Sequence, residues 1–300
     1  MLAGMSTAFF GYIRFAKIIF SLVVVLSATS FAAQQTIDYA FVAPESCEAE
    51  FRLRLPDAKP IKYVLVLVPG SDGDGRGMVN DAGWRQFAEE HHCAIVACRL
   101  VVKDNVPTYM RVEDWSGAAL FAALKHFSEQ TKKPELATVP LLMWGYSAGG
   151  CYSYNIANWR PERVAGFVLV KAALNTDEAC AAMLKIPALF IGGETDHGHT
   201  DLVASRYASA RSRGALWCLA VEAGSGHEVG QSAVLGRAFL RDVIARRAAV
   251  ASTGSADVSW LGDSDTFEIF ANGEKKSADT TWLPSEAFAK AWQAFVGGKK

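Results

Sequence analysis

A serine flanked by glycines is the residue of this sequence best placed to do chemistry. The apolar run LLMWGY, residues 141–146, leads directly into Ser147, so that residues 145–149 read Gly-Tyr-Ser-Ala-Gly. Between a strand and a helix, this pattern is typical of a nucleophile elbow, a sharp turn that exposes a serine hydroxyl. Glycines suit the flanking positions because larger side chains would collide with the strand and the helix. The motif alone leaves a second interpretation open, a glycine-rich turn with an incidental serine.

The partners that a nucleophilic serine needs follow downstream in the chain. A serine hydroxyl attacks poorly unless a histidine accepts its proton and a carboxylate orients that histidine. Asp196 lies just past the apolar run IPALFIGG, and His227 lies in the glycine-rich segment AGSGHEVG that follows the next run. All three residues are predicted at carboxyl ends of strands, where open α/β sheets bind their ligands. We therefore expect Ser147 to act as nucleophile, His227 as base and Asp196 as the orienting acid.

Other residues near the expected acid keep alternatives open. Glu194 lies two residues earlier and is a second candidate, as is Asp177, which follows the run GFVLVKA. His197 and His199 would suggest a metal site together with Asp201, but a His-x-His pair without a third ligand of clear spacing is weak evidence for a metal. We interpret this stretch as a polar loop, and we expect neither a metal nor another cofactor.

A second glycine-rich stretch, VPGSDGDGRG at residues 68–77, follows the first predicted parallel strand. It does not fit a phosphate loop, because Arg76 stands where a lysine is needed. It does not fit a calcium loop, because the same arginine takes a ligand position and a glycine replaces the closing glutamate. The stretch fits an oxyanion loop, in which backbone N–H groups near Ser71 and at Ala148 bind the negative oxygen of a tetrahedral intermediate.

The elements expected around these residues follow one alternating pattern. Two stretches, IDYAFVA and CEAEFRLRL, predict an opening antiparallel pair. Six short apolar runs then alternate with helix-like stretches, which is typical of strands buried on both faces of a parallel sheet. The runs are IKYVLVLVPG, CAIVACRLV, VPLLMWGY, RVAGFVLVKA, IPALFIGGE and ALWCLAVEAG, and the helix-like stretches include residues 114–131, 176–185 and 200–214. We predict one α/β domain over residues 33–250, with a mostly parallel, doubly wound sheet of about eight strands.

The N-terminus predicts export. Residues 1–32 combine two basic residues, a short apolar stretch and small residues before Ala32, which is typical of a signal peptide cleaved after that alanine. The apolar stretch is short of the roughly 20 residues of a membrane span. We expect a secreted or periplasmic protein without stable membrane association, and an uncleaved anchor is the alternative.

Export would permit up to three disulfides among the six cysteines. A Cys93–Cys98 bridge is not expected, because their Cα atoms would lie roughly 16 Å apart in a strand.

The last fifty residues read as a separate appendage. The small-residue stretch ASTGSADV opens residues 251–300. Near the end, PSEAFAKAWQAFVGG predicts a helix with Phe288, Trp292 and Phe295 on one face. A segment with so narrow an apolar face rarely folds alone, so we expect the appendage to pack on the main domain.

Composition limits the classes of partner. About half of the residues are hydrophobic, which is typical of a globular chain with a large core. The formal net charge is −1 and the sequence contains no basic cluster, so we expect no nucleic-acid partner.

Residues from about 60 to 240 resemble the α/β-hydrolase superfamily. The resemblance is carried, in order, by VPGSDGDG for the oxyanion loop, GYSAGG for the elbow, GGETDHGH for the acid and GSGHEVG for the histidine. Within the superfamily, the short chain with an export signal resembles small secreted esterases of the feruloyl, acetylxylan or polyester-depolymerase kind. It departs from many of them in having Pro69-Gly70 where they have His-Gly.

The resemblance implies a secreted serine hydrolase that cleaves carboxylic esters through an acyl-enzyme intermediate and needs no cofactor. Its substrate would be a small-molecule or polymer-linked ester. A serine peptidase of the prolyl oligopeptidase kind is the alternative, because the elbow and the spacing of about thirty residues between Asp196 and His227 also resemble that group. A non-catalytic binding protein on the same scaffold is a third interpretation. The motifs are specific for the superfamily and not for a substrate.

Overall fold

A large, mostly parallel sheet forms the centre of the computed structural model, which describes residues 36–43, 47–57, 60–71, 73–102, 108–174, 178–254, 259–271 and 280–298. Its eight strands are β1 (Ile37–Phe41), β2 (Cys47–Arg54), β3 (Tyr63–Val68), β4 (Cys93–Val102), β5 (Leu141–Tyr146), β6 (Val164–Val170), β7 (Ala188–Gly193) and β8 (Trp217–Glu222). They are hydrogen-bonded in the order β1-β2-β4-β3-β5-β6-β7-β8.

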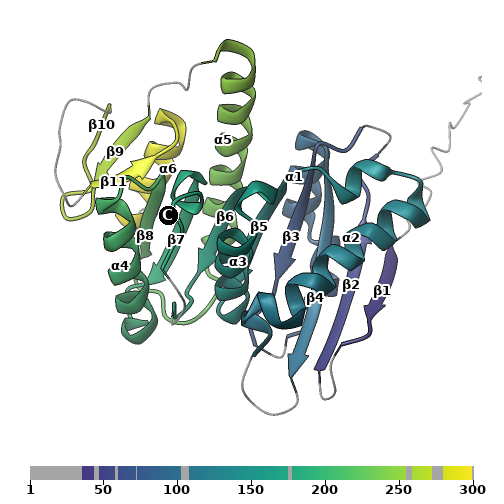
Figure 1. Cartoon of the computed structure of the whole chain (residues 1–300). Helices are drawn as coiled ribbons and strands as arrows, with labels where there is room; N and C mark the ends of the chain where they lie inside the picture. The colour runs from purple at the N-terminus through teal and green to yellow at the C-terminus, as the bar shows by residue number, and fades with distance from the viewer. Residues whose placement is uncertain are drawn as a thin grey trace, which may run out of the picture. The chain divides into compact units, whose positions relative to one another are not determined.

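The pairing directions follow the sequence prediction. Strand β2 is antiparallel to both β1 and β4. Every other neighbouring pair, from β4 and β3 through to β7 and β8, is parallel (Figure 1). The predicted α/β fold, with a mostly parallel sheet of about eight strands opened by an antiparallel pair, is confirmed.

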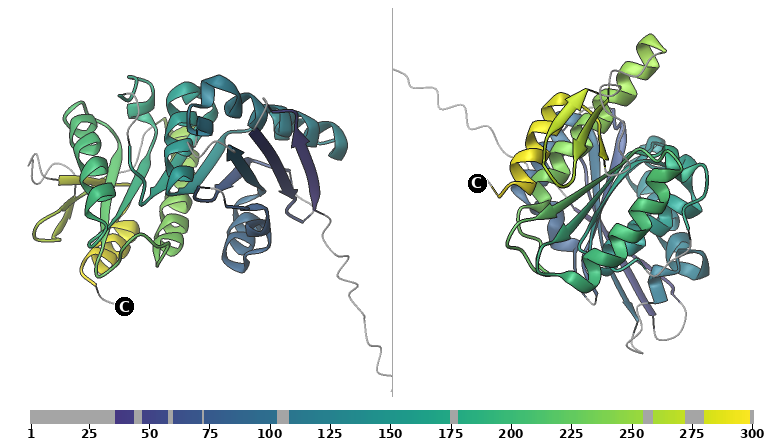
Figure 2. Two further views of the ribbon diagram at one scale, coloured as in Figure 1. Left: turned by 90° about the horizontal axis from the view of Figure 1, so that it is seen from below. Right: turned by 90° about the vertical axis from the view of Figure 1, so that its left-hand side faces the viewer.

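The apolar runs form strands because both of their faces are buried. In β3, Val64, Val66 and Val68 belong to one hydrophobic core, while Leu65 and Leu67 belong to the core on the opposite face. The first core lies under α2 (Gly117–Thr131), α3 (Ala148–Trp159) and α4 (His197–Ser212). The second lies under α1 (Ala82–His91), α5 (Ser232–Thr253) and α6 (Glu286–Val296), as Figures 1 and 2 show. Side chains alternate across a strand, so each run supplies both cores.

The C-terminal part contains a small sheet that the sequence analysis did not anticipate. Its strands are β9 (Trp260–Asp263), β10 (Ile269–Ala271) and β11 (Thr280–Leu283), antiparallel in the order β10-β9-β11. Helix α6 begins after Ser285, whose side chain accepts a hydrogen bond from the Phe288 N–H. Trp292 of α6 is buried in the second core, and its indole Nε1 donates to the backbone oxygen of Leu219 in β8 at 2.8 Å.

Two local features differ from the sequence pattern. Helix α5 continues to Thr253, three residues past position 250, and is capped by Gly254, which takes the left-handed conformation, with φ 68°, that stops a helix. Within the helix-like stretch 176–185, the described residues contain only a short 3₁₀ turn, Met183–Lys185. Here the Cys180 N–H is bonded to the side chain of Asn158 on α3, at 2.8 Å, and not to a helix of its own.

The cysteines are free thiols. All six lie in the described part of the chain, and none forms a disulfide. Burial raises the pKa of Cys93, Cys98, Cys151 and Cys218 to about 12, so these four are not reactive thiolates at neutral pH. The predicted signal peptide lies outside the described residues. Among the described helices, none combines the length and the apolar character that a membrane crossing requires.

Candidate active site

Ser147 occupies a strained turn between β5 and α3. Its backbone has φ 53° and ψ −124°, a left-handed φ that a residue with a side chain seldom adopts. The flanking glycines are required by close approach of the backbone: a Cβ on Gly145 would lie 2.0 Å from the oxygen of Gly149, and one on Gly149 would lie 2.3 Å from the oxygen of Pro69. The Ser147 N–H donates to the oxygen of Val170 at the end of β6, 2.8 Å away. These contacts hold the turn against its strain.

The structure brings Ser147, His227 and Asp196 together from three strand ends. His227 Nε2 lies 3.0 Å from Ser147 Oγ, and His227 Nδ1 lies 2.7 Å from Asp196 Oδ2. An ionised carboxylate only accepts hydrogen bonds, so Nδ1 carries the ring proton and donates a hydrogen bond to Asp196. Nε2 is then free to accept from the serine hydroxyl. This tautomer is the one that a base for Ser147 requires.

The environment keeps Asp196 ionised. Its side chain is 9% exposed, whereas that of His227 is 35% exposed and open to a substrate. Burial alone would raise the pKa of Asp196, but hydrogen bonds from His227 and His199 outweigh it, and the pKa is lowered from its ordinary value. The carboxylate is also adjacent to the start of α4, where the helix dipole favours negative charge.

The two expected oxyanion donors lie in the loop after β3 and at the start of α3. Ala148 is the first residue of α3, so its N–H is one of those that the helix itself leaves unused. Ser71 is exposed, in the turn closed by the hydrogen bond from the Gly73 N–H to the oxygen of Gly70. A Cβ on Gly70 would lie 3.5 Å from Ser147 Cβ, which places this loop beside the elbow.

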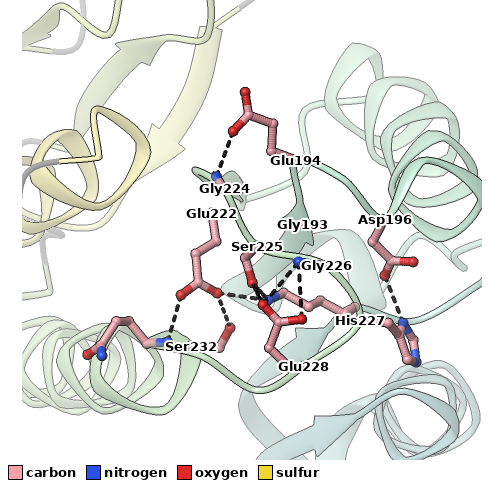
Figure 3. Close-up of polar contacts among 12 residues, drawn as sticks. Gly193, Glu194, Asp196, Glu222, Gly224, Ser225, Gly226, His227, Glu228 and Ser232 are labelled. Carbon is pink, nitrogen blue, oxygen red and sulfur yellow. Dashed lines mark hydrogen bonds and ion pairs between the residues drawn. The ribbon is translucent and has the colours of Figure 1, made fainter.

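Of the alternative acids, Glu194 lies in the described part of the chain, and its carboxylate pairs with another group than His227. Glu194 is exposed, and its carboxylate accepts from the N–H of Gly224 at 2.6 Å, so it supports the loop before His227 (Figure 3). Asp177 lies outside the described residues. His197 is exposed on the first turn of α4.

The contact of His199 with Asp196 was not anticipated from the sequence. The Nδ1 atom of His199 lies 2.8 Å from Asp196 Oδ1, and its ring lies beside that of His227, tilted by 33° and with centroids 4.3 Å apart. Asp196, His199 and His227 offer ligand atoms within 4.8 Å of one another, the single group in the described residues with the composition of a metal site. It differs from the set considered from the sequence, because His197 and Asp201 take no part. The three side chains already pair with one another through the two carboxylate oxygens.

A buried ion pair anchors the loop that carries His227. Lys171, just after β6, has a fully buried side chain, and its Nζ donates to Glu222 Oε2 at the end of β8, 2.8 Å away. Nζ also donates to Ser225 Oγ. The other carboxylate oxygen, Glu222 Oε1, accepts from the Gln231 N–H at 2.7 Å, so both ends of the loop meet at one carboxylate (Figure 3).

Two further contacts fix the loop around His227. The Glu228 carboxylate accepts from Ser225 Oγ at 2.5 Å and from the Gly226 N–H at 3.0 Å (Figure 3). These bonds lower the pKa of Glu228, the one from Ser225 most strongly. On the elbow side, the hydroxyl of Tyr146 donates to the backbone oxygen of His227 at 2.5 Å. The elbow and the loop that carries His227 are therefore joined by this bond as well as by the contact between Ser147 and His227.

Comparisons with known proteins agree with this architecture. Neither a protein-family model nor a curated protein sequence matches the chain. Among solved structures, a ferulic acid esterase is similar with a TM-score of 0.51 and 14% identity, over 70% of this chain and 98% of that one. An S-formylglutathione hydrolase from Staphylococcus aureus is similar with a TM-score of 0.50 and 13% identity, over 70% of this chain and 96% of that one. At such identities the similarity concerns the fold. Together with the strand order and the elbow between β5 and α3, it shows that this chain has the α/β-hydrolase fold.

Proposed function

We propose that this protein is a serine hydrolase that cleaves carboxylic esters through Ser147. The observation that carries the proposal is the continuous chain of hydrogen bonds from Ser147 Oγ through His227 to Asp196. A glycine-rich turn with an incidental serine would not require a histidine at hydrogen-bond distance from the serine hydroxyl. Nor would it require an ionised carboxylate that holds this histidine in the tautomer a base needs. The ferulic acid esterase and the S-formylglutathione hydrolase named above have the same fold, which raises the expectation of ester chemistry without fixing a substrate.

The geometry suggests the following acylation step. His227 Nε2 accepts the proton of the Ser147 hydroxyl as Oγ forms a bond to the ester carbonyl carbon. The carbonyl electron pair moves onto oxygen, and in this proposal the N–H groups of Ala148 and of the loop near Ser71 bind the resulting oxyanion. Asp196 stabilises the imidazolium that has formed. When the intermediate collapses, the bond to the alcohol oxygen breaks, and that oxygen takes the proton from His227.

Deacylation repeats the same path with water. His227 accepts a proton from a water molecule as the water oxygen attacks the acyl carbon. The bond to Ser147 Oγ then breaks, Oγ regains its proton from His227, and the carboxylic acid leaves. Each step uses groups of the chain and water.

The test is hydrolysis of p-nitrophenyl acetate by the parent and by Ser147→Ala. We expect the variant to lose at least about a thousandfold in kcat, because removal of the nucleophile leaves only binding and oxyanion contacts. Its Tm should stay within a few degrees of the parent value. A folded variant that hydrolyses the ester at the parent rate would refute the proposal. Aminoacyl and peptide anilides measured in parallel decide between the esterase and the peptidase alternative, since both use these three side chains.

We further propose that the chain is exported and cleaved after Ala32, giving a secreted or periplasmic enzyme. The support is the sequence of residues 1–32, with basic residues, an apolar stretch and small residues in the order of a signal peptide. N-terminal sequencing of the protein from its native host tests this. A mature chain that still begins with the leader would contradict it.

A further inference from the structure

The Asp196 carboxylate has two histidine partners where the proposed reaction needs one. Asp196 directly precedes α4, yet its side chain makes no capping hydrogen bond to that helix. Oδ2 accepts from His227 and Oδ1 accepts from His199, at 2.7 and 2.8 Å. The carboxylate is nearly buried, so an oxygen that lost its donor would have little water to replace it.

The backbone around His199 is firmly held. His199 lies in the first turn of α4, and its N–H donates to the oxygen of Asp196 at 3.2 Å. The next residue, Thr200, donates through its N–H to the same oxygen and through its hydroxyl to the oxygen of Gly193 at the end of β7. The helix start is thus fixed to the strand that ends just before Asp196. A side chain three residues after the acid therefore reaches it from a rigid position.

The ring of His199 also covers one face of His227. Their centroids are 4.3 Å apart and the ring planes are inclined by 33°. The centroid of the Tyr146 ring lies 5.4 Å from that of His227. The base is therefore bounded by two aromatic rings as well as by its hydrogen bonds to Ser147 and Asp196.

We propose that His199 is a positioning residue for the acid and base of this site. By donating from Nδ1 to Oδ1, it fixes the rotation of the Asp196 carboxylate so that Oδ2 points at His227 Nδ1. His227 in turn keeps Nε2 directed at Ser147 Oγ. The role of His199 is exerted through Asp196 and His227, and it exchanges no proton with Ser147 or the ester. The inference rests on the proposed function, because it concerns the alignment of the same three side chains.

Three substitutions separate the hydrogen bond from the ring. His199→Asn keeps an N–H donor, because its amide nitrogen is separated from Cα by the same number of bonds as Nδ1. His199→Phe keeps a ring against His227 but has no donor, and His199→Ala has neither. His197→Ala is the matched control, since His197 is an exposed histidine in the same helical turn.

The measurement is kcat and KM for a p-nitrophenyl ester, with Tm recorded for each variant. We expect kcat to fall about tenfold to a hundredfold in His199→Ala and His199→Phe, the range expected for a lost hydrogen bond to a charged group, with KM changed less than about twofold. His199→Asn should retain kcat within about threefold of the parent, and His197→Ala should match the parent. A role confined to folding would lower Tm and not produce this split between kcat and KM.

The outcomes are distinct. Parent-like kcat in folded His199→Ala overturns the inference, and so does an equal loss in the asparagine and phenylalanine variants. Should the alanine variant not fold, the asparagine and phenylalanine pair makes the same comparison. If the parent hydrolyses no ester and Ser147 reacts with no fluorophosphonate, the proposed function fails and this inference falls with it. If the parent hydrolyses the ester and the His199 variants keep its kcat, the inference about His199 fails and the proposed function stands.

Discussion

Replacing Lys171 by an uncharged residue should lower the unfolding free energy more than removing any single surface charge. Its ammonium group is fully buried, and its partner Glu222 is 11% exposed, so neither charge is well hydrated. In Lys171→Met the aliphatic volume is largely kept, while Glu222 is left as a buried carboxylate without its cation. Breaking a buried pair in this way costs about 3–5 kcal/mol of unfolding free energy. Glu222 retains the N–H of Gln231, which favours the lower half of that range.

The assay is urea unfolding at neutral pH, followed by fluorescence. With a slope of about 2–3 kcal/mol per molar urea for a chain of this size, a loss of about 3 kcal/mol lowers the midpoint by about 1–1.5 M. The double variant Lys171→Met, Glu222→Gln should lose less than the single one, because no unpaired charge remains. Lys290→Met, which breaks an exposed pair with Glu286, is the control and should cost less than about 1 kcal/mol. A single-variant loss below about 1 kcal/mol, or a double variant less stable than the single one, would refute the reasoning.

Two further predictions concern the loop after β3 and the elbow. A hydrogen bond from Arg76 lowers the pKa of Asp74 to about 2, below the unfolded value of 3.8, so its stabilising effect is present above about pH 4 and is lost as pH falls toward 2. Between pH 4 and pH 2, the unfolding free energy of Asp74→Asn should therefore fall less than that of the parent. The difference should be under about 1 kcal/mol, because the pair is exposed. Urea unfolding of both proteins at each pH measures it, and equal losses would contradict the prediction. Gly149→Ala should lower the unfolding free energy by at least about 3 kcal/mol, because the new Cβ would meet the oxygen of Pro69, whereas Gly198→Ala, with open space around it, should be neutral or slightly stabilising. Equal Tm values for the two alanine variants would show that the elbow tolerates a side chain.

The parallel strands could be predicted because continuous apolar runs indicate strands that are buried on both faces. The run YVLVLV gives this signal without reference to the rest of the chain, and β3 divides it between two cores. The proximity of Ser147, Asp196 and His227 could be predicted for a related reason. Each follows such a run, and strand ends on one edge of a parallel sheet meet in space.

The features that could not be predicted depend on contacts between residues that lie far apart in the sequence or belong to no recognisable motif. Lys171 and Glu222 are 51 positions apart, and neither belongs to a motif. His199 was interpreted as part of a polar loop because its pairing with Asp196 depends on α4 beginning at His197, and helix boundaries are the least certain part of a sequence prediction. The three-stranded C-terminal sheet has strands of only three or four residues, too short for a periodic pattern.

The central claim is that Ser147 is an activated nucleophile, and covalent labelling tests it most directly. The folded protein is treated with a fluorophosphonate, and the adduct is located by intact mass and peptide mapping. We predict one phosphonyl group per chain, on Ser147, and no adduct in folded Ser147→Ala. Labelling should also slow by at least about a hundredfold in His227→Ala, because the serine then loses its base. An unlabelled parent chain, or an adduct on another residue while Ser147 stays free, would contradict the account.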